Sequence, residues 1–360
     1  ELSKIGHEVT IFETKPYVGG LAAGFEKDAD DYPDNWEWDL DRFYHHWFTN
    51  DYHMLQLIEE LGHSDEVITV RPVTASWYDG DAYQLDSPMS LMKFPALSLI
   101  DKIRTGLTLA LFKLTPRGKF YEQWTVDSVL PKLMGRKSYE LLWKPLMVGK
   151  FDEYFDQINL AWFWARIYKR TPSLAYYKGG FQRIANVIAE AVKENGGTIH
   201  LETMITKTEQ KDNQWEISYQ NNDGNQTELF DRVISTTPMP IFQKLFPQLP
   251  QDYKEKYKSL TGIGAHVLVL VLKESFLPKN IYWLNIHDTD WPFLVAAEHT
   301  HFADPSHYGG DTVLYVGDYL PANHDLMQLD KDELIDTFLP YLQKVSSSFT
   351  KEQIKQSWLW

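Results

Sequence analysis

The first thirteen residues constrain the fold of this chain more than any other stretch. Glu1–Lys4 resembles the end of a helix, and Gly6 can adopt the left-handed conformation that closes one. A β-rich apolar run follows and ends on the carboxylate of Glu13. This order predicts the second half of a βαβ unit, whose glycine-rich turn would lie before residue 1. In a dinucleotide-binding fold such an acid accepts hydrogen bonds from the ribose hydroxyls, although a solvent-exposed strand end gives the same pattern.

A glycine-containing loop, Pro16–Gly24, comes shortly after this acid. Gly19 and Gly20 leave their backbone N–H groups unobstructed, which suits a bound diphosphate. An ordinary surface loop has a similar composition. The position of the glycine pair, which begins six residues after Glu13, favours the diphosphate interpretation.

Composition excludes several classes of protein. A length of 360 residues predicts about two domains, and a net charge of −15 argues against a nucleic-acid partner. The absence of Cys excludes disulfides and cysteine nucleophiles within the chain and fits a reducing compartment. No signal peptide is visible, and no apolar run approaches the roughly 18 residues that span a bilayer. We therefore expect a cytoplasmic protein, with the inner face of the membrane as an alternative location.

Two clusters of potential metal ligands have simpler interpretations. Asp28–Asp41 is rich in Asp but lacks the spacing of an EF-hand, so we expect a solvent-exposed acidic loop rather than a calcium site. His299, His301 and His307 have no carboxylate at a motif spacing. We therefore expect no metal site.

Two predicted helical regions leave alternatives open. Leu91–Leu114 predicts one or two amphipathic helices that could lie on a membrane surface or cap a cavity, and we expect them to be buried against the protein. Asn159–Arg170 predicts a helix with many aromatic residues and a basic end. Aromatic residues at helical spacing usually belong to a core, and lining of a ligand site is the alternative.

The second half of the chain predicts a helix after Gly179-Gly180 and then mostly strands. Apolar residues at helical spacing extend to Gly196-Gly197, where the helix ends. Residues 231–238 read as a buried strand that returns to the first sheet, and antiparallel strands are expected from Thr261 onward. The other predicted elements are strands at 198–201, 214–219, 226–230, 266–272, 281–286, 293–298, 312–316 and 354–360, and a helix at 331–345.

The order of four motifs resembles that of FAD-dependent flavoproteins. These motifs are residues 6–13, the Gly19-Gly20 pair, residues 176–180 with the helix that follows, and residues 233–238. The resemblance is to the superfamily of amine oxidases, protoporphyrinogen oxidases and phytoene desaturases. Residues 43–62 and 143–170 look most like its bacterial protoporphyrinogen-oxidase-like branch.

The resemblance implies an α/β fold with a discontinuous, Rossmann-like FAD-binding domain of the GR2 type. An α+β substrate domain would contain an antiparallel sheet and a helical subdomain. The expected segments are 1–75 and 176–245 for the FAD domain, 76–175 for the helical substrate subdomain, and 246–360 for the remaining substrate domain. FAD would be bound noncovalently, and the segments that complete its site would lie outside residues 1–360.

The resemblance also assigns cofactor-binding roles to residues near the N-terminus. Glu13 would bind the adenosine ribose, and Gly19 and Gly20 would approach the diphosphate and the ribityl chain. Leu21 stands where many amine oxidases have an arginine, so binding of the diphosphate by a guanidinium is not expected there.

Three further residues are assigned by the same resemblance. The backbone of Ile205 would bond the adenine, and Thr236 would lie close by. His45 matches a position near the flavin ring in the related UDP-galactopyranose mutases, whose His-rich segment resembles residues 45–51.

Three functions remain open at this stage. The first is an FAD-dependent oxidoreductase that removes hydride from an amine, a porphyrinogen-like or a polyene-like substrate, with His45 and Arg166 as candidate catalytic residues. Trp162–Arg170 and Leu91–Leu114 would shape the substrate cavity. The second is a flavin-dependent sugar-nucleotide mutase in which Arg166 or Arg170 binds a substrate diphosphate. The third is a non-catalytic flavoprotein remnant. The expected partner is a small-molecule substrate in the first two cases.

Overall fold

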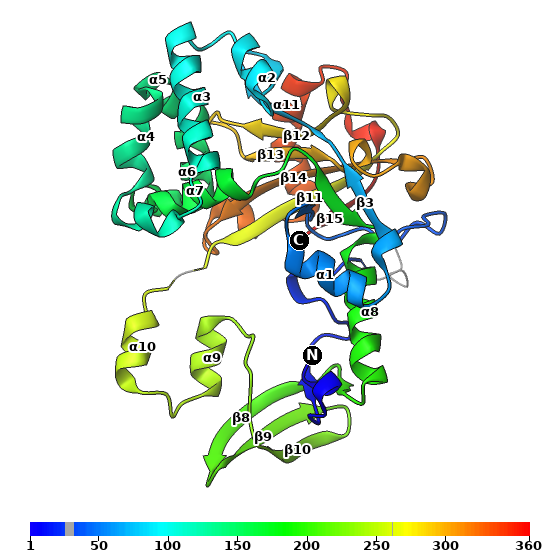
Figure 1. Cartoon of the computed structure of the whole chain (residues 1–360). Helices are drawn as coiled ribbons and strands as arrows, with labels where there is room; N and C mark the ends of the chain where they lie inside the picture. The colour runs from blue at the N-terminus through cyan, green and yellow to red at the C-terminus, as the bar shows by residue number, and fades with distance from the viewer. Residues whose placement is uncertain (26–31, 261) are drawn as a thin grey trace. The chain divides into compact units, whose positions relative to one another are not determined.

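The computed structural model describes residues 1–25, 32–260 and 262–360, which form two compact units. Unit 1 comprises Glu1–Ala23 and Phe181–Gly262, and unit 2 comprises Gly24–Gly180 and Ile263–Trp360. The chain thus enters unit 2 after Ala23, returns to unit 1 after Gly180 and re-enters unit 2 after Gly262 (Figure 1). These crossings divide the predicted segments 1–75 and 246–360 between the two units.

Unit 1 contains the parallel strand pair that the N-terminal pattern predicts. β1 (Thr10–Phe12) runs parallel to β7 (Thr198–His200), with Thr10 opposite Thr198. α8 (Gly180–Glu194) leads into β7, and the left-handed Gly196 lies between them. This helix and the parallel pair confirm the mixed α/β character expected from the sequence.

A three-stranded antiparallel sheet completes unit 1, and one predicted strand is absent from it. Residues 231–238 pair with no strand among the described residues, and most of their side chains are exposed. The predicted buried strand at 231–238 is therefore wrong, because a buried strand needs a neighbour for its backbone groups and an apolar cover. The other elements of unit 1 are β8 (Met204–Lys211), β9 (Gln214–Asn221), β10 (Gly224–Phe230), α9 (Met239–Leu245) and α10 (Gln251–Tyr257).

Unit 2 is built around a seven-stranded sheet in the order β15-β11-β14-β13-β12-β4-β5. Its neighbours are antiparallel except for β12 and β4, which run parallel. The strands predicted beyond residue 261 are confirmed with small changes at their ends. The strands are β4 (Val73–Tyr78), β5 (Asp81–Gln84), β11 (Gly264–Leu272), β12 (Ile281–Ile286), β13 (Val295–Glu298), β14 (Thr312–Leu320) and β15 (Ile354–Leu359).

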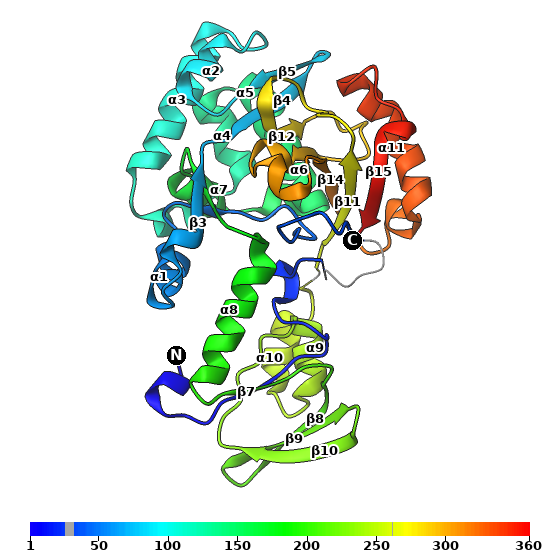
Figure 2. The same ribbon diagram turned by 90° about the vertical axis from the view of Figure 1, so that its right-hand side faces the viewer.

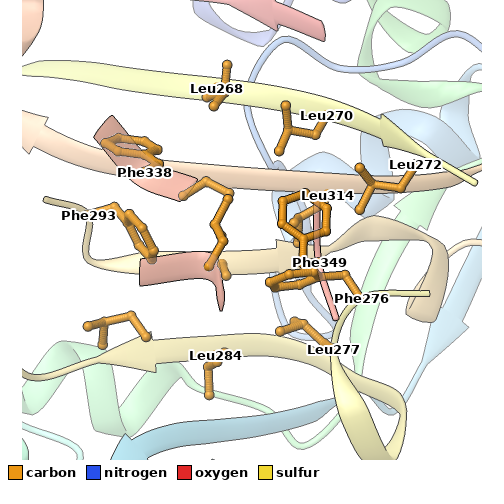
Figure 3. Close-up of a cluster of buried hydrophobic side chains, with 14 of the residues drawn as sticks. Leu268, Leu270, Leu272, Phe276, Leu277, Leu284, Phe293, Leu314, Phe338 and Phe349 are labelled. Carbon is orange, nitrogen blue, oxygen red and sulfur yellow. The ribbon is translucent and has the colours of Figure 1, made fainter. Parts of the chain in front are cut away.

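One face of this sheet packs against α11 (Lys331–Val345), the helix that the sequence predicts with the same bounds. Leu268, Leu270 and Leu272 alternate along β11 and lie in one cluster with Phe338 of α11 (Figure 3). All four side chains are buried. Burial of a side chain of this size contributes roughly 1.5–3 kcal/mol, so this layer holds the sheet firmly in place.

Helices form the second part of unit 2 (Figure 2). Phe112 and Phe163 lie in their core with ring centroids 5.7 Å apart. The aromatic helix predicted at 159–170 thus contributes mainly to a core. The helices are α2 (Pro88–Lys93), α3 (Leu99–Leu114), α4 (Val126–Met134), α5 (Arg136–Ser138), a π-helical turn (Tyr139–Trp143), α6 (Lys144–Phe151) and α7 (Leu160–Lys169).

A smaller sheet and one helix complete unit 2. β6 (Leu174–Tyr177) lies between β2 (Trp47–Phe48) and β3 (Val67–Val70), and α1 (Tyr52–Glu60) connects β2 to β3. No helix in the described part of the chain combines the length and the hydropathy that crossing a membrane requires.

The predicted acidic loop is only partly within the described residues. Asp28, Asp30 and Asp31 lie outside them. Asp41 is 1% exposed, and its Oδ2 accepts a hydrogen bond of 2.7 Å from the hydroxyl of Tyr176. The expected solvent exposure is therefore wrong at Asp41, because the sequence does not reveal this partner 135 residues away.

Candidate functional site

Unit 2 contains a cavity of about 200 Å³ whose wall comes from several separate segments of the chain. α6 and α7 supply Lys150 and Arg166, and Arg170 follows directly after α7. The segment that enters β2 supplies the ring of His46. β12 and the residue after it supply Tyr282, Trp283 and His287. Other segments add further polar and aromatic groups, among them Asp86 and Tyr319.

The helical side of the cavity is cationic. Arg166 and Arg170 are four residues apart, so they lie on the same side of the helix end. Lys150 contributes a third positive charge, and its Nζ lies 4.2 Å from the ring centroid of Tyr319. The cavity wall therefore presents three cations from two neighbouring helices.

These cations are poorly compensated. Asp86 is the one carboxylate among the described side chains of the wall, and neither arginine forms an ion pair within the described part of the chain. Burial, and then the neighbouring Arg170, lowers the pKa of Arg166 to about 10. Arg166 remains charged at neutral pH all the same. A buried charge without a partner favours binding of an anion, and a guanidinium suits carboxylate or phosphate groups.

Imidazole and phenol groups form another part of the wall. The Nδ1 of His46 lies 3.2 Å from the hydroxyl of Tyr282, and the Nε2 of His287 lies 3.0 Å from the Oγ of Ser76. Burial lowers the pKa of both histidines to about 4, so both are neutral at pH 7. The other ring nitrogen of His287 is buried and has no hydrogen-bond partner in the described structure. His287 therefore brings an unsatisfied polar atom to the wall of the cavity.

Two of the residues predicted as catalytic candidates have different positions relative to the cavity. Arg166 lines it, whereas His45 is absent from its wall and His46 takes that place. Neighbouring side chains on an extended segment point to opposite sides, which separates the two histidines. Burial lowers the pKa of His45, and its ring lies 6.2 Å from that of Phe43. Of the two helical segments expected to shape the cavity, α7 takes part and Leu91–Leu114 does not.

The predicted cofactor-binding residues other than His45 all lie in unit 1. Glu13 follows β1 directly, its N–H donates to the carbonyl of His200, and its carbonyl accepts from the N–H of Thr203. One carboxylate oxygen of Glu13 accepts from the N–H of Lys15 at 2.8 Å. These hydrogen bonds fix Glu13 at the end of the parallel strand pair.

The glycine pair has the backbone conformation that only glycine adopts easily. Gly19 has φ +114°, and an added Cβ would approach Ala185 of α8 to 3.3 Å and Ala23 to 3.2 Å. Gly20 has φ +55° with open space where a side chain would be. Leu21 is 84% exposed. The loop packs closely on α8 at Gly19 and exposes its backbone at Gly20.

Ile205 and Thr236 occupy different kinds of structure. Ile205 pairs with Tyr219 in the sheet, and the register shifts directly after it, before Lys207. Such a bulge releases backbone groups from pairing. Thr236 is exposed in the irregular segment between β10 and α9. Ile205 thus lies two residues after Thr203, whose N–H donates to the carbonyl of Glu13.

Sequence reasoning missed Lys150, Tyr282 and His287, and singled out Arg170 only for the mutase hypothesis. His287 follows the predicted strand at 281–286 directly, which is the one local signal that could have indicated it. Lys150 and Tyr282 show no such signal, because their proximity depends on the fold. The residues His299 and His301, weighed as metal ligands, have structural partners: Tyr308 for the first and the carbonyl of Ile281 for the second. No cluster of three or more potential ligands occurs in the described chain.

The sequence was compared with protein families and with curated proteins. The family of flavin-containing amine oxidoreductases matches residues 1–357. None of the curated proteins matches the sequence.

Several solved structures are similar over nearly the whole chain. An oxidoreductase from Methanosarcina mazei has a TM-score of 0.75 at 17% identity and covers 100% of this chain and 83% of its own. A protoporphyrinogen oxidase-like protein from an Exiguobacterium species has 0.72 at 16%, covering 98% and 80%. Reduced UDP-galactopyranose mutase has 0.71 at 14%, covering 100% and 78%. Putrescine oxidase bound to putrescine has 0.68 at 14%, covering 99% and 80%. At these identities the similarity establishes the fold.

Proposed function

Because this chain belongs to the flavin-containing amine oxidoreductase family, we propose that it is an FAD-dependent oxidoreductase acting on a small anionic organic substrate. The observation that carries the substrate class is the cavity of unit 2, where Arg166, Arg170 and Lys150 face one carboxylate. A carboxylate-bearing amine or a porphyrinogen-like molecule suits this charge. An uncharged polyene has no anionic group that could pair with these cations.

Unit 1 supplies features that fit noncovalent FAD. The carboxylate of Glu13 has one oxygen bonded to Lys15 and a second that can accept from a ribose hydroxyl. Gly20 has an open backbone that a diphosphate can approach, and the bulge after Ile205 can free a backbone group for adenine. The chain has no Cys through which flavin could be attached. Bound FAD would accept the hydride removed from a substrate carbon.

The residues of unit 2 would bind and orient the substrate. Arg166 and Arg170 would hold an anionic group through paired, charge-assisted hydrogen bonds. The free ring nitrogen of His287 would bond a polar substrate atom, and the neutral state of this ring at pH 7 avoids a further positive charge. The rings of Tyr44 and Trp283, whose centroids lie 4.9 Å apart, would exclude water.

Flavin content is the decisive test. The purified protein should show flavin absorbance near neutral pH, and acid precipitation should release the flavin into the supernatant as FAD. Anionic amines and porphyrinogens should then bleach this absorbance in the absence of oxygen, whereas uncharged analogues should not. Flavin-free protein that does not take up added FAD would contradict the proposal and favour a non-catalytic remnant.

A second candidate is a flavin-dependent sugar-nucleotide mutase. Two arginines four residues apart in one cavity could bind both phosphates of a nucleoside diphosphate. Turnover of a UDP-sugar by the reduced enzyme without an external electron acceptor would favour this candidate over the first. Consumption of an acceptor in proportion to product would exclude it.

A cytoplasmic location is proposed from composition, since 360 residues contain no Cys. Cell fractionation with a compartment marker tests it. Recovery with periplasmic or secreted proteins would contradict it.

A further inference from the structure

The outward face of α3 is apolar, while its inward face includes hydroxyl groups. Thr105, Thr108 and Phe112 are buried in the helical part of unit 2, and the hydroxyl of Thr108 donates to the carbonyl of Arg104 at 2.8 Å. The large aliphatic side chains lie mostly on the other side. This distribution is opposite to that of an ordinary surface helix, whose apolar residues point to the core. The expectation that Leu91–Leu114 is buried is therefore wrong for this face.

Six large aliphatic residues form this exposed face, which we call the α3 apolar face. Their side chains are between 48% and 81% exposed. At about 100° per residue they fall within an arc of roughly 120° on the helix. Figure 2 shows α3 along the left-hand edge of unit 2. The residues are Leu99, Ile100, Ile103, Leu107, Leu111 and Leu114.

Basic side chains border the α3 apolar face. On the helix, Arg104 lies at one edge of the arc, and Lys102 and Lys113 lie at the other. All three donate to backbone carbonyls: Arg104 to Leu133, Lys102 to Met92, and Lys113 to Arg170. None forms an ion pair with a carboxylate in the described structure. Their charges are therefore held in place and remain available to an anionic surface.

The surrounding segment concentrates positive charge in an acidic protein. Residues 88–137 contain nine Lys or Arg and three Asp or Glu, a net charge of +6, whereas the whole chain has −15. In the described chain, Arg136 is the one cation of this segment with a carboxylate partner, Glu140. The charge of this segment is thus opposite to that of the rest of the molecule.

We propose that the α3 apolar face docks on the surface of an anionic lipid bilayer, with α3 parallel to the membrane plane. An exposed aliphatic arc bordered by cations is the pattern of a helix that lies at a lipid interface, where the aliphatic groups enter the acyl boundary and the cations meet lipid phosphates. A symmetric contact between two copies would place the +6 segment against itself, so the charge favours lipid over a second copy. This proposal does not depend on the proposed flavin chemistry.

Co-sedimentation of the full chain with vesicles tests the proposal. Vesicles of three parts phosphatidylcholine and one part phosphatidylglycerol should pellet the protein, and pure phosphatidylcholine vesicles should bind it about tenfold less because the cations lack a counterpart. The double variant Ile103→Gln/Leu107→Gln should lose about tenfold or more of the binding to the anionic vesicles. Raising the salt concentration should weaken the binding of the unmodified chain.

A matched control uses exposed aliphatic residues outside this segment. Leu229 and Ile241 in unit 1 are 55% and 48% exposed, so Leu229→Gln/Ile241→Gln removes comparable apolar surface and should bind vesicles like the unmodified chain. Thermal unfolding of both variants verifies that they are folded. Equal binding to neutral vesicles, no binding to either kind, or equal losses in both double variants would overturn the proposal. So would a dimer in light scattering that Ile103→Gln/Leu107→Gln dissociates, since a second copy would then cover the face.

Discussion

In unit 1 the candidate cofactor residues present mainly backbone, whereas in unit 2 the cavity wall consists of side chains. Gly19 and Gly20 both have φ above zero, Gly20 has open space beside its backbone, and the strand register shifts after Ile205. The cavity of unit 2 instead presents guanidinium, imidazole and phenol groups. The first kind of site suits a ligand that many proteins share, and the second suits discrimination between substrates.

The difference also explains which site the sequence reveals. A site formed by backbone groups requires glycines and strand ends at short spacing, and such motifs can be recognised in a single sequence. Arg166, His46 and His287 lie on three segments far apart in the chain, and no spacing rule links them. The following predictions test whether the two sites are in fact separable.

The largest expected effect is a loss of stability of unit 2 at acid pH, because His299 is buried there. Burial lowers the pKa of His299 to about 3. Below pH 6.5 the unfolded chain binds a proton here that the folded protein does not. The stabilising contribution of His299 is therefore complete above pH 6.5 and is lost as the pH falls toward 3, by about 1.4 kcal/mol per pH unit. Urea unfolding followed by Trp emission measures this, since Trp215 alone of the 13 tryptophans belongs to unit 1 by sequence.

His299→Gln should reduce this acid dependence, to which the buried His46 and His287 also contribute. His53→Gln at an exposed position should leave it unchanged. Asp318 acts in the opposite direction, because burial raises its pKa to about 7. Its contribution declines as the pH rises from 3.8 to 7, so the comparison between variants, rather than the raw curve, isolates His299. An identical acid dependence in the His299→Gln variant would contradict the assignment.

Glu13→Ala should weaken FAD binding roughly 10- to 100-fold, because it removes a charge-assisted hydrogen bond to the ribose worth about 1.5–3 kcal/mol. Glu13→Gln keeps an acceptor and should weaken it less. Fluorescence titration of the apoprotein with FAD measures the affinity, and Glu8→Ala at an exposed position is the control. Anion binding in unit 2 should not change. Equal flavin affinity in Glu13→Ala and the unmodified protein would show that this carboxylate is only a strand end.

Arg166→Ala should weaken anion binding in unit 2 and leave flavin binding unchanged. Loss of one guanidinium from the cavity should reduce the affinity for inorganic pyrophosphate roughly 10- to 100-fold, as expected for charge-assisted hydrogen bonds. Flavin content should stay the same. Calorimetric titration measures the affinity, and Arg117→Ala outside the cavity serves as the control. A variant that loses flavin together with anion binding would break the separation between the two sites.

The smallest effect concerns the neighbouring histidines. His46→Ala removes the contact with Tyr282 and should lower the melting temperature by a few degrees, on the order of 1 kcal/mol, with an unchanged flavin spectrum. His45→Ala should shift the flavin absorbance or reduction potential and leave stability nearly intact, as its resemblance to a flavin-contacting residue predicts. Identical behaviour of the two variants would remove any special role for His45.

Regular elements with strong local patterns were predictable from the sequence. The helix at 331–345 has a capping box, in which Asp330 and Glu333 satisfy each other's backbone N–H groups, and its bounds are confirmed. β11 follows from its uninterrupted apolar run, which is typical of a strand buried on both faces.

The failures have a common physical cause, since each depends on a partner distant in sequence. Residues 231–238 have strand composition, but no strand of the described residues pairs with them. Asp41 is buried because Tyr176 donates to it. The apolar pattern of α3 predicts an amphipathic helix, but the pattern alone does not indicate whether protein or another medium covers the apolar side.

The ammonium group of Lys113 connects the outside of unit 2 to the cavity. Its Nζ donates to the carbonyls of Tyr168 and Arg170, at 2.8 and 2.7 Å, and so holds the last turn of α7 against the end of α3. A displacement of α3 is therefore transmitted to the residue that carries one of the cavity's two guanidinium groups. Where a ligand repositions Arg170 through this contact, thermodynamic reciprocity sets one factor for both effects. The ligand alters the affinity of the α3 apolar face for its surface by the same factor as that surface alters the affinity for the ligand.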